Sequence, residues 1–408
     1  MTLAPGRSRS RTGTQAIWGL PGRVWSVTAI SFLANTADNF LLFVLFWIAA
    51  PQGWSGVETA LIVLVLRLPS LGSGILGGAA VDRFGGRLLV LVDVTTRAAL
   101  MVVLALSGWT GQLPLIAVLV VGAVSGTLSP TTYSGVRWLL PRYVEEAGLP
   151  RANAVLAIGD QLPLLLGSAL VGPALAILGP GPSLLIPAAM LAIASGLALC
   201  LPAPATLGDG GLSTTDGTAA RAKRLPARVL AVIALSTAYY LAYGPFETVT
   251  PDLVRDQLDG AENTYGLLWA LFGIGALATL SLAPLLARHR PGLVNAFGAI
   301  AWGVAMLPLA MVDDVPVAAA LFLVGGAIWG PYSAVEATAL HRWTDPSRHG
   351  QVFGLQRSLL ATATPLGAAL GAIALDHADP GPILGVSALG CALAGLLALG
   401  NTELRRAR

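Results

Sequence analysis

The sequence has little charge and almost no cysteine, and each shortage excludes a class of protein. Its 408 residues include only two cysteines, too few for the disulfide framework of a small secreted domain. Charged residues make up 11% of the chain, against about 25% in an ordinary soluble domain. Hydrophobic residues reach 55%, and a soluble chain of that composition would aggregate, whereas a disordered one would be far more polar. The composition therefore predicts a protein that spans a membrane many times.

Several chemical motifs are also missing. The sequence contains no G-x-x-x-x-G-K-S/T loop, which argues against an ATP-driven pump. Its four histidines have no metal-ligand spacing, and no nucleophile lies beside a base at catalytic spacing. We therefore expect no enzyme activity, no metal and no cofactor. The arginine-rich termini are interpreted as anchors on the inner membrane face rather than as nucleic-acid arms.

Twelve stretches are apolar enough to cross the hydrocarbon, which takes about 20 residues of helix. We predict an all-α membrane protein in which twelve transmembrane helices form two parallel six-helix bundles. The predicted parts are an N-terminal tail at 1–23, a bundle at 24–201, a flexible linker at 202–226, a second bundle at 227–400 and a tail at 401–408. The predicted spans are residues 24–50, 56–80, 88–107, 114–138, 152–178, 183–201, 227–250, 264–287, 293–312, 315–340, 352–375 and 383–399.

The basic residues predict the orientation, and a weak repeat predicts the architecture. With both termini in the cytoplasm, 23 of the 24 lysines and arginines lie in cytoplasmic segments or within spans, and only Arg255 lies outside. Val121-Gly122 followed by Gly126 resembles Val324-Gly325 followed by Gly330. Parallel six-helix repeats of this kind are typical of transporters that hold a substrate cavity between the two halves.

A motif lies between the second and third predicted spans. It consists of Gly78, Asp82, Arg83, Gly85 and Arg87. With Gly86 in place of one basic residue, the pattern resembles the loop motif of the major facilitator superfamily. That resemblance implies a gate on the cytoplasmic side, in which the acid meets the N-terminal end of the eleventh helix.

Further residues resemble a narrower branch of this superfamily. They are Asp38 in the first span, Arg67 followed by Pro69-Ser70, Asp93 and Arg97 four residues apart, and Tyr243-Gly244-Pro245. The branch contains macrolide-efflux proteins and the enterobactin exporter, which are drug:proton antiporters. Its helix-five pattern, G-x-x-x-G-P-x-x-G-G, survives here only as Gly167 followed by Gly172-Pro173.

Ionisable side chains at membrane depth cost roughly 2.5–3.5 kcal/mol each, so each should face water or a partner. We interpret Asp38, near the middle of the first span, as the proton-coupling residue, because a carboxylate in a low-dielectric cavity can gain and lose a proton. The alternative is a buried acid held by Asn35, Asn39 or an arginine. Asp160 is the second candidate, and Arg357, which the repeat places at its pseudo-symmetric position, is interpreted as a structural charge that can pair with it.

Three further charges, Arg67, Asp93 and Arg97, are interpreted as structural pairs rather than as transport residues. Asp93 and Arg97 can pair with each other because they share one helix face.

Polar and aromatic side chains recur at helical spacing on the first, fourth, seventh and tenth spans, the helices that line the cavity in the resembled superfamily. Such faces suit a bulky apolar molecule, with a cationic group held by acids and rings. The predicted substrate-binding residues are Asn35, Asn39, Phe46, Thr131, Ser134, Tyr239, Tyr243, Phe246, Glu247, Trp329, Tyr332 and Glu336.

The sequence thus predicts a monomeric, multi-pass carrier of the plasma membrane that exports hydrophobic or amphipathic small molecules in exchange for protons by alternating access. Its partners would be the bilayer, the substrate and protons. Two alternatives stay open within the same class, namely export of a siderophore or an endogenous secondary metabolite, and movement of lysophospholipids. A membrane-embedded enzyme and a sensor that transports nothing are the alternatives from other classes.

Overall fold

The computed structural model describes residues 20–70, 80–81, 83–109, 111–145, 148–202, 225–288, 290–345 and 348–406. Within these ranges every regular element is a helix and none is a strand, as the composition predicts. Two residues of the predicted loop motif, Gly78 and Asp82, lie outside the described residues, and so does the side chain of Asp160.

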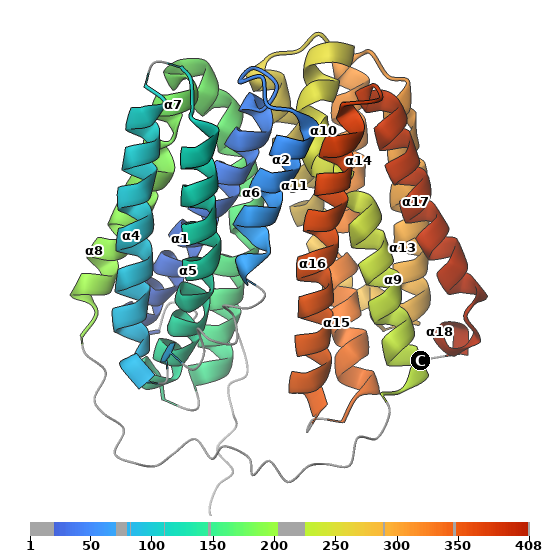
Figure 1. Ribbon diagram of the computed structural model, residues 1–408. Coiled ribbons are helices and arrows are strands. Elements are labelled where there is room, and N and C mark those ends of the chain that lie inside the picture. The colour runs from blue at the N-terminus through green and yellow to red at the C-terminus, as the bar shows by residue number, and fades with distance from the viewer. Residues whose placement is uncertain are drawn as a thin grey trace, which may run out of the picture.

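Each half of the chain consists of helices that follow one another along the sequence (Figure 1). The first half contains α1 (Gly22–Ile48), α2 (Gly56–Arg67), α4 (Gly86–Ser107), α5 (Leu115–Tyr143), α6 (Leu149–Leu178), α7 (Pro180–Ser183) and α8 (Leu185–Cys200). The second half contains α9 (Ala227–Tyr243), α10 (Pro245–Asp252), η3 (Leu253–Gln257), α11 (Glu262–Leu280), α12 (Ala283–Leu286), α13 (Pro291–Met306), η4 (Leu307–Ala310), α14 (Val315–Trp329), α15 (Tyr332–Trp343), α16 (His349–Leu375), α17 (Pro380–Gly400) and α18 (Thr402–Arg406).

Ten helical segments in the described part of the chain are long and apolar enough to cross a membrane. Each matches one predicted span. The other two predicted spans are 56–80, where α2 ends at Arg67 and residues 71–79 lie outside the described ranges, and 152–178, where Leu166–Leu178 is a shorter apolar segment of α6.

Two spans of the second half are interrupted where glycine and proline adjoin. α9 gives way to α10 at Gly244-Pro245, and α14 gives way to α15 at Gly330-Pro331. Proline has no N–H to donate and its ring clashes with the preceding turn, so a helix bends at these positions.

The helices of the two halves form two groups, which lie to the left and right in Figure 1. We call the end that holds the C-terminus of α8 and the N-terminus of α9 the linker end, and the opposite end the far end. The groups meet where α2 packs on α16 and α6 packs on α11.

Close backbone contacts seal the far end. A Cβ added to Gly56 would lie 2.0 Å from the carbonyl oxygen of Ala372, and one on Gly172 would lie 2.4 Å from that of Glu262. Glycine is therefore required at both crossings. At the same end Trp47 stacks on Tyr265 with ring centroids 5.2 Å apart.

Candidate functional site

A cavity of about 760 Å³ lies between the two groups of helices. The first half contributes α1, α2 and α5 to its wall, and the second half contributes α9, α10, α14 and α16. Gly354, Arg357 and Ser358 line the cavity and are exposed, so solvent reaches it past the first turns of α16. The cavity therefore occupies the middle of the molecule and extends toward the linker end.

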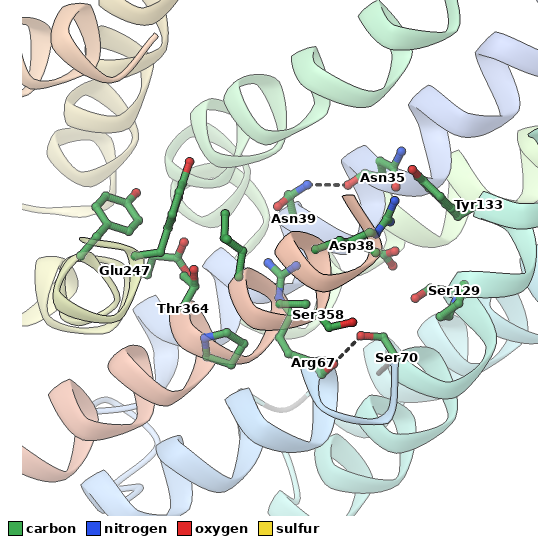
Figure 2. A pocket seen from close by; sticks show the side chains of 18 of the residues that line it. Asn35, Asp38, Asn39, Arg67, Ser70, Ser129, Tyr133, Glu247, Ser358 and Thr364 are labelled. Carbon is green, nitrogen blue, oxygen red and sulfur yellow. Dashed lines mark hydrogen bonds between the residues drawn. The ribbon is translucent and has the colours of Figure 1, made fainter. Parts of the chain in front are cut away.

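Most side chains that line the cavity are polar. Ser129 and Ser134 come from α5, and Ser358 and Thr364 come from α16. Figure 2 shows Ser129, Ser358 and Thr364 around Asp38 and Arg67. Since hydrocarbon cannot solvate such groups, a wall of this kind requires water or a polar solute in the cavity.

A triad of charged residues, Asp38, Asp93 and Arg97, lies at one wall of the cavity. The Arg97 guanidinium donates through Nε to one Asp93 oxygen at 2.6 Å and through Nη2 to the other at 3.1 Å. It also donates through Nη1 to Asp38 on α1. Asp93 and Arg97 are fully buried, whereas the Asp38 side chain is 31% exposed and faces the cavity. With all three groups ionised, the triad has an excess of one negative charge, and only its Asp38 member lines the cavity.

Arg67 and Glu247 add a second set of charges. Arg67 lies within coulombic range of both Asp38 and Glu247. Its backbone oxygen accepts from the Ser70 hydroxyl at 2.5 Å. Its guanidinium has no hydrogen bond or ion pair with any residue that the structure describes. In Figure 2 Arg67 lies between Asp38 and Glu247.

A tyrosine is flanked by two arginines from opposite halves. The guanidinium carbon of Arg137 lies 3.2 Å from the centroid of the Tyr133 ring, and that of Arg357 lies 3.8 Å from it. Arg137 shares α5 with Tyr133, whereas Arg357 comes from α16 and lines the cavity. This cation–π contact bridges the halves away from the far end.

The structure separates the predicted substrate residues into two sets. Asn35, Asn39, Ser134, Tyr243, Glu247 and Trp329 line the cavity. Thr131, Phe46, Tyr239, Phe246, Tyr332 and Glu336 are not among the described residues that line it.

The second set is packed elsewhere. Tyr239 stacks on Tyr332 at 4.8 Å, and Phe246 lies 4.7 Å from Trp302, edge to face. Thr131 donates to the Leu128 carbonyl at 2.7 Å, and Phe46 packs against Phe43. Glu336 is completely buried, and neither of its carboxylate oxygens has a hydrogen-bond partner in the described part of the chain.

The described residues of the predicted gate make contacts within the first half. Arg87 donates to the carbonyls of Ala198 and Leu199 at 3.2 and 2.8 Å, which ties the start of α4 to the end of α8. Gly85, at φ +84°, supplies the left-handed turn before α4. Arg83 lies over the Phe84 ring at 5.3 Å. The gating role of this loop stays a prediction.

Several residues that line the cavity were not predicted from the sequence. Tyr133 and Tyr240 are next to residues that were selected, and α2 and α16 were not expected to line the cavity. The signal on α16 was available, because Arg357-Ser358 and Thr364 interrupt an otherwise apolar span.

Comparison with known proteins gives a consistent result. The sequence profile of the Major Facilitator Superfamily matches residues 24–336 and, in a second match, residues 233–407. An uncharacterized MFS-type transporter of Sinorhizobium fredii is 26% identical over 88% of this chain and 89% of its own. The multidrug efflux pump Tap of Mycobacterium tuberculosis is 26% identical over 94% of both chains. A crystal structure of a nucleoside transporter NupG variant superposes with a TM-score of 0.74 and 14% identity, over 93% of this chain and 99% of that one.

Proposed function

Because the chain belongs to the major facilitator superfamily and is a multi-pass membrane transporter, we propose that it exports hydrophobic or amphipathic small molecules in exchange for protons. The cavity between the two halves is the observation that supports this proposal most directly. Multidrug efflux by the related Tap pump supports export in particular. The proposal places the protein in the plasma membrane.

The proposed architecture has twelve spans with both termini in the cytoplasm, as the distribution of basic residues favours. Residues 24–201 and 227–400 are proposed to act as two units that rock about the cavity. Sealing of the far end and solvent access past α16 support an inward-facing arrangement of these units. In the opposite arrangement the far end would part and the loop motif would close the linker end.

Asp38 is proposed to carry the coupled proton, with Asp160 as the second candidate. The supporting geometry is that Asp38 alone of the triad reaches the cavity, where water can deliver a proton. Protonation would neutralise its carboxylate and weaken its ion pair with Arg97, while Asp93 keeps that guanidinium paired. The tie between α1 and α4 would thereby loosen without leaving a buried charge unpaired.

The test is dye export by reconstituted protein under an imposed pH gradient. We expect Asp38→Asn to lower gradient-driven export at least tenfold while it retains exchange of dye across the membrane without a gradient. Asp313→Asn, which removes an exposed acid outside the helices, is the matched control and should behave as wild type. Unchanged gradient-driven export by Asp38→Asn would refute the coupling role.

The alternatives from the sequence, a siderophore or secondary-metabolite exporter and a lysophospholipid transporter, use the same cavity. Competition between the dye and each of these classes in the same vesicles separates them. A sensor that transports nothing predicts no gradient-dependent flux at all.

A further inference from the structure

The central cavity contains charges of both signs at different positions. Arg357 lies at the side where α5 and α16 face each other, over Tyr133. Glu247 lies on α10 beside Tyr243 and Tyr240, which also line the cavity. In Figure 2 Tyr133 and Ser129 are at one side of the site, and Glu247 is at the other. The cavity therefore contains charged groups of both signs at separate positions, with Asp38 and Arg67 nearer its centre, and is not uniformly apolar.

The cavity has two guanidinium groups that have no acid partner among the described residues. Neither Arg357 nor Arg67 forms an ion pair with an acid among the described residues. Arg357 is exposed and lines the cavity, with its guanidinium over the ring of Tyr133. Arg357 comes from α16 and Arg67 from the end of α2, and each guanidinium can donate two parallel N–H bonds to one carboxylate.

The negative side has an acid and aromatic rings. The Glu247 carboxylate makes no hydrogen bond or ion pair within the described ranges, and Tyr240, Tyr243 and Trp329 line the cavity with it. An acid beside aromatic faces attracts an organic cation through charge and cation–π contact.

We infer that the cavity selects zwitterionic amphipathic molecules, whose carboxylate binds at Arg357 and Arg67 and whose cationic aromatic part lies between Glu247 and the neighbouring rings. This inference rests on the proposed function and names its substrate class. A simple cation would face two arginines that have no acid partner within the described ranges, and a neutral apolar molecule would displace their water without replacing the hydrogen bonds. A zwitterion can pair its carboxylate with the arginines and its cationic group with Glu247 at the same time.

Two dyes that differ only at the carboxylate test this inference. We would measure their binding to the purified full-length protein in lipid nanodiscs by fluorescence anisotropy, without any gradient. The probes are a cationic rhodamine with a free carboxylate and the methyl ester of the same dye. We expect the carboxylate dye to bind at least tenfold more tightly than the ester.

Variants then assign the preference to residues. Arg357→Gln should remove most of the preference by weakening binding of the carboxylate dye alone, and Arg67→Gln should act in the same direction. Glu247→Gln should weaken both dyes. Arg228→Gln, which removes an arginine that lies over Trp343 and does not line the cavity, is the matched control. Because each variant is judged by the ratio of two affinities, partial misfolding does not imitate the result.

Equal binding of the two dyes, tighter binding of the ester, binding of neither, or an equal loss of both in Arg357→Gln would overturn the inference. Flux measurements on the same preparations keep the two proposals apart. Gradient-driven export of both dyes without a preference would refute the zwitterion class and leave the export function standing. A binding preference without any flux would refute the export function.

Discussion

The first half of the chain is held at its centre by charges, whereas the second half is held by aromatic rings. In the first half, α1 and α4 are joined by the triad of Asp38, Asp93 and Arg97. In the second half, an aromatic cluster joins α9, α10, α13 and α15. It consists of Tyr239, Tyr243, Phe246, Trp302 and Tyr332.

The ion pairs of the first half and the stacked rings of the second half respond differently to protonation. An ion pair inside the membrane depends on the charge of each member, so a proton on one acid changes how firmly two helices are joined. Stacked rings have no such dependence, and their contribution is fixed by contact area and geometry. The difference suggests that the first half contains the element that changes during the cycle, while the second half provides a constant framework.

The largest effect should come from Arg97→Gln, which leaves two acids without their shared cation. Removal of one member of a buried ion pair costs about 3–5 kcal/mol. Denaturation in mixed detergent micelles would measure this change in the free energy of unfolding. Arg87→Gln on the same helix is the control. It loses two bonds to carbonyls near the helix end and should cost about 1–2 kcal/mol. An equal loss in the free energy of unfolding for the two variants would contradict the stabilising role assigned to the triad.

Trp302→Ala should disrupt the aromatic cluster. It should lower the free energy of unfolding by about 3 kcal/mol, because the substitution leaves a cavity. Trp302 is fully buried and contacts three rings of the cluster. Unlike a change to the triad, this loss should leave the pH dependence of the remaining dye export unchanged. Trp109→Ala, at a side chain that is 59% exposed, should stay within about 0.5 kcal/mol of wild type. A shifted pH dependence in Trp302→Ala would undermine the contrast between the halves.

A gain in stability is expected where the second half contains a polar group without a partner. Glu336→Met replaces a completely buried carboxyl group that has no hydrogen bond within the described residues by an apolar side chain of similar volume. The free energy of unfolding should rise by about 1–2 kcal/mol. Glu58→Met, which removes the partner of Ser55 at the start of α2, should have the opposite sign. If export also falls in Glu336→Met, this acid contacts the substrate at another stage of the cycle.

The smallest effect should come from Tyr239→Phe. The Tyr239 hydroxyl has no hydrogen-bond partner in the described part of the chain, so its loss should change the free energy of unfolding by less than about 0.5 kcal/mol. Tyr332→Phe, which removes a hydroxyl that lies 3.3 Å from that of Ser236, should cost about 1 kcal/mol. The same denaturation assay measures both variants. A large cost for Tyr239→Phe would mean that the cluster depends on its hydroxyl as well as on stacking.

Local patterns predicted the helices and the short-range contacts well. Ten predicted spans coincide with long apolar helices, because hydrophobic length is a property of the segment alone. The pairing of Asp93 with Arg97 follows from their spacing on one helix. The bond from Arg97 to Asp38 was left as one alternative, because it depends on how α1 packs within the bundle.

The wall of the cavity was harder to predict. A polar or aromatic stripe shows that a helix face avoids lipid, and it does not distinguish a face toward the cavity from a face toward another helix. Tyr243 and Tyr239 lie on one stripe, yet Tyr243 lines the cavity and Tyr239 stacks on Tyr332. Conversely, Arg67 and Arg357 were expected to act as structural charges, and both line the cavity.

One contact at the far end has a consequence for how readily the two halves separate. The amide of Gly56, at the start of α2, donates to the Asp376 carboxylate at the end of α16, with a distance of 2.8 Å. Ser55 already accepts from the Glu58 amide in the same turn, so at this crossing parting the halves leaves one N–H without its partner. An amide in the first turn of a helix that becomes exposed to solvent donates its hydrogen bond to water instead. Parting at this crossing therefore exchanges one hydrogen bond for another, whereas the bond from Arg255 to the Trp47 carbonyl, which also joins the halves at this end, must break as well.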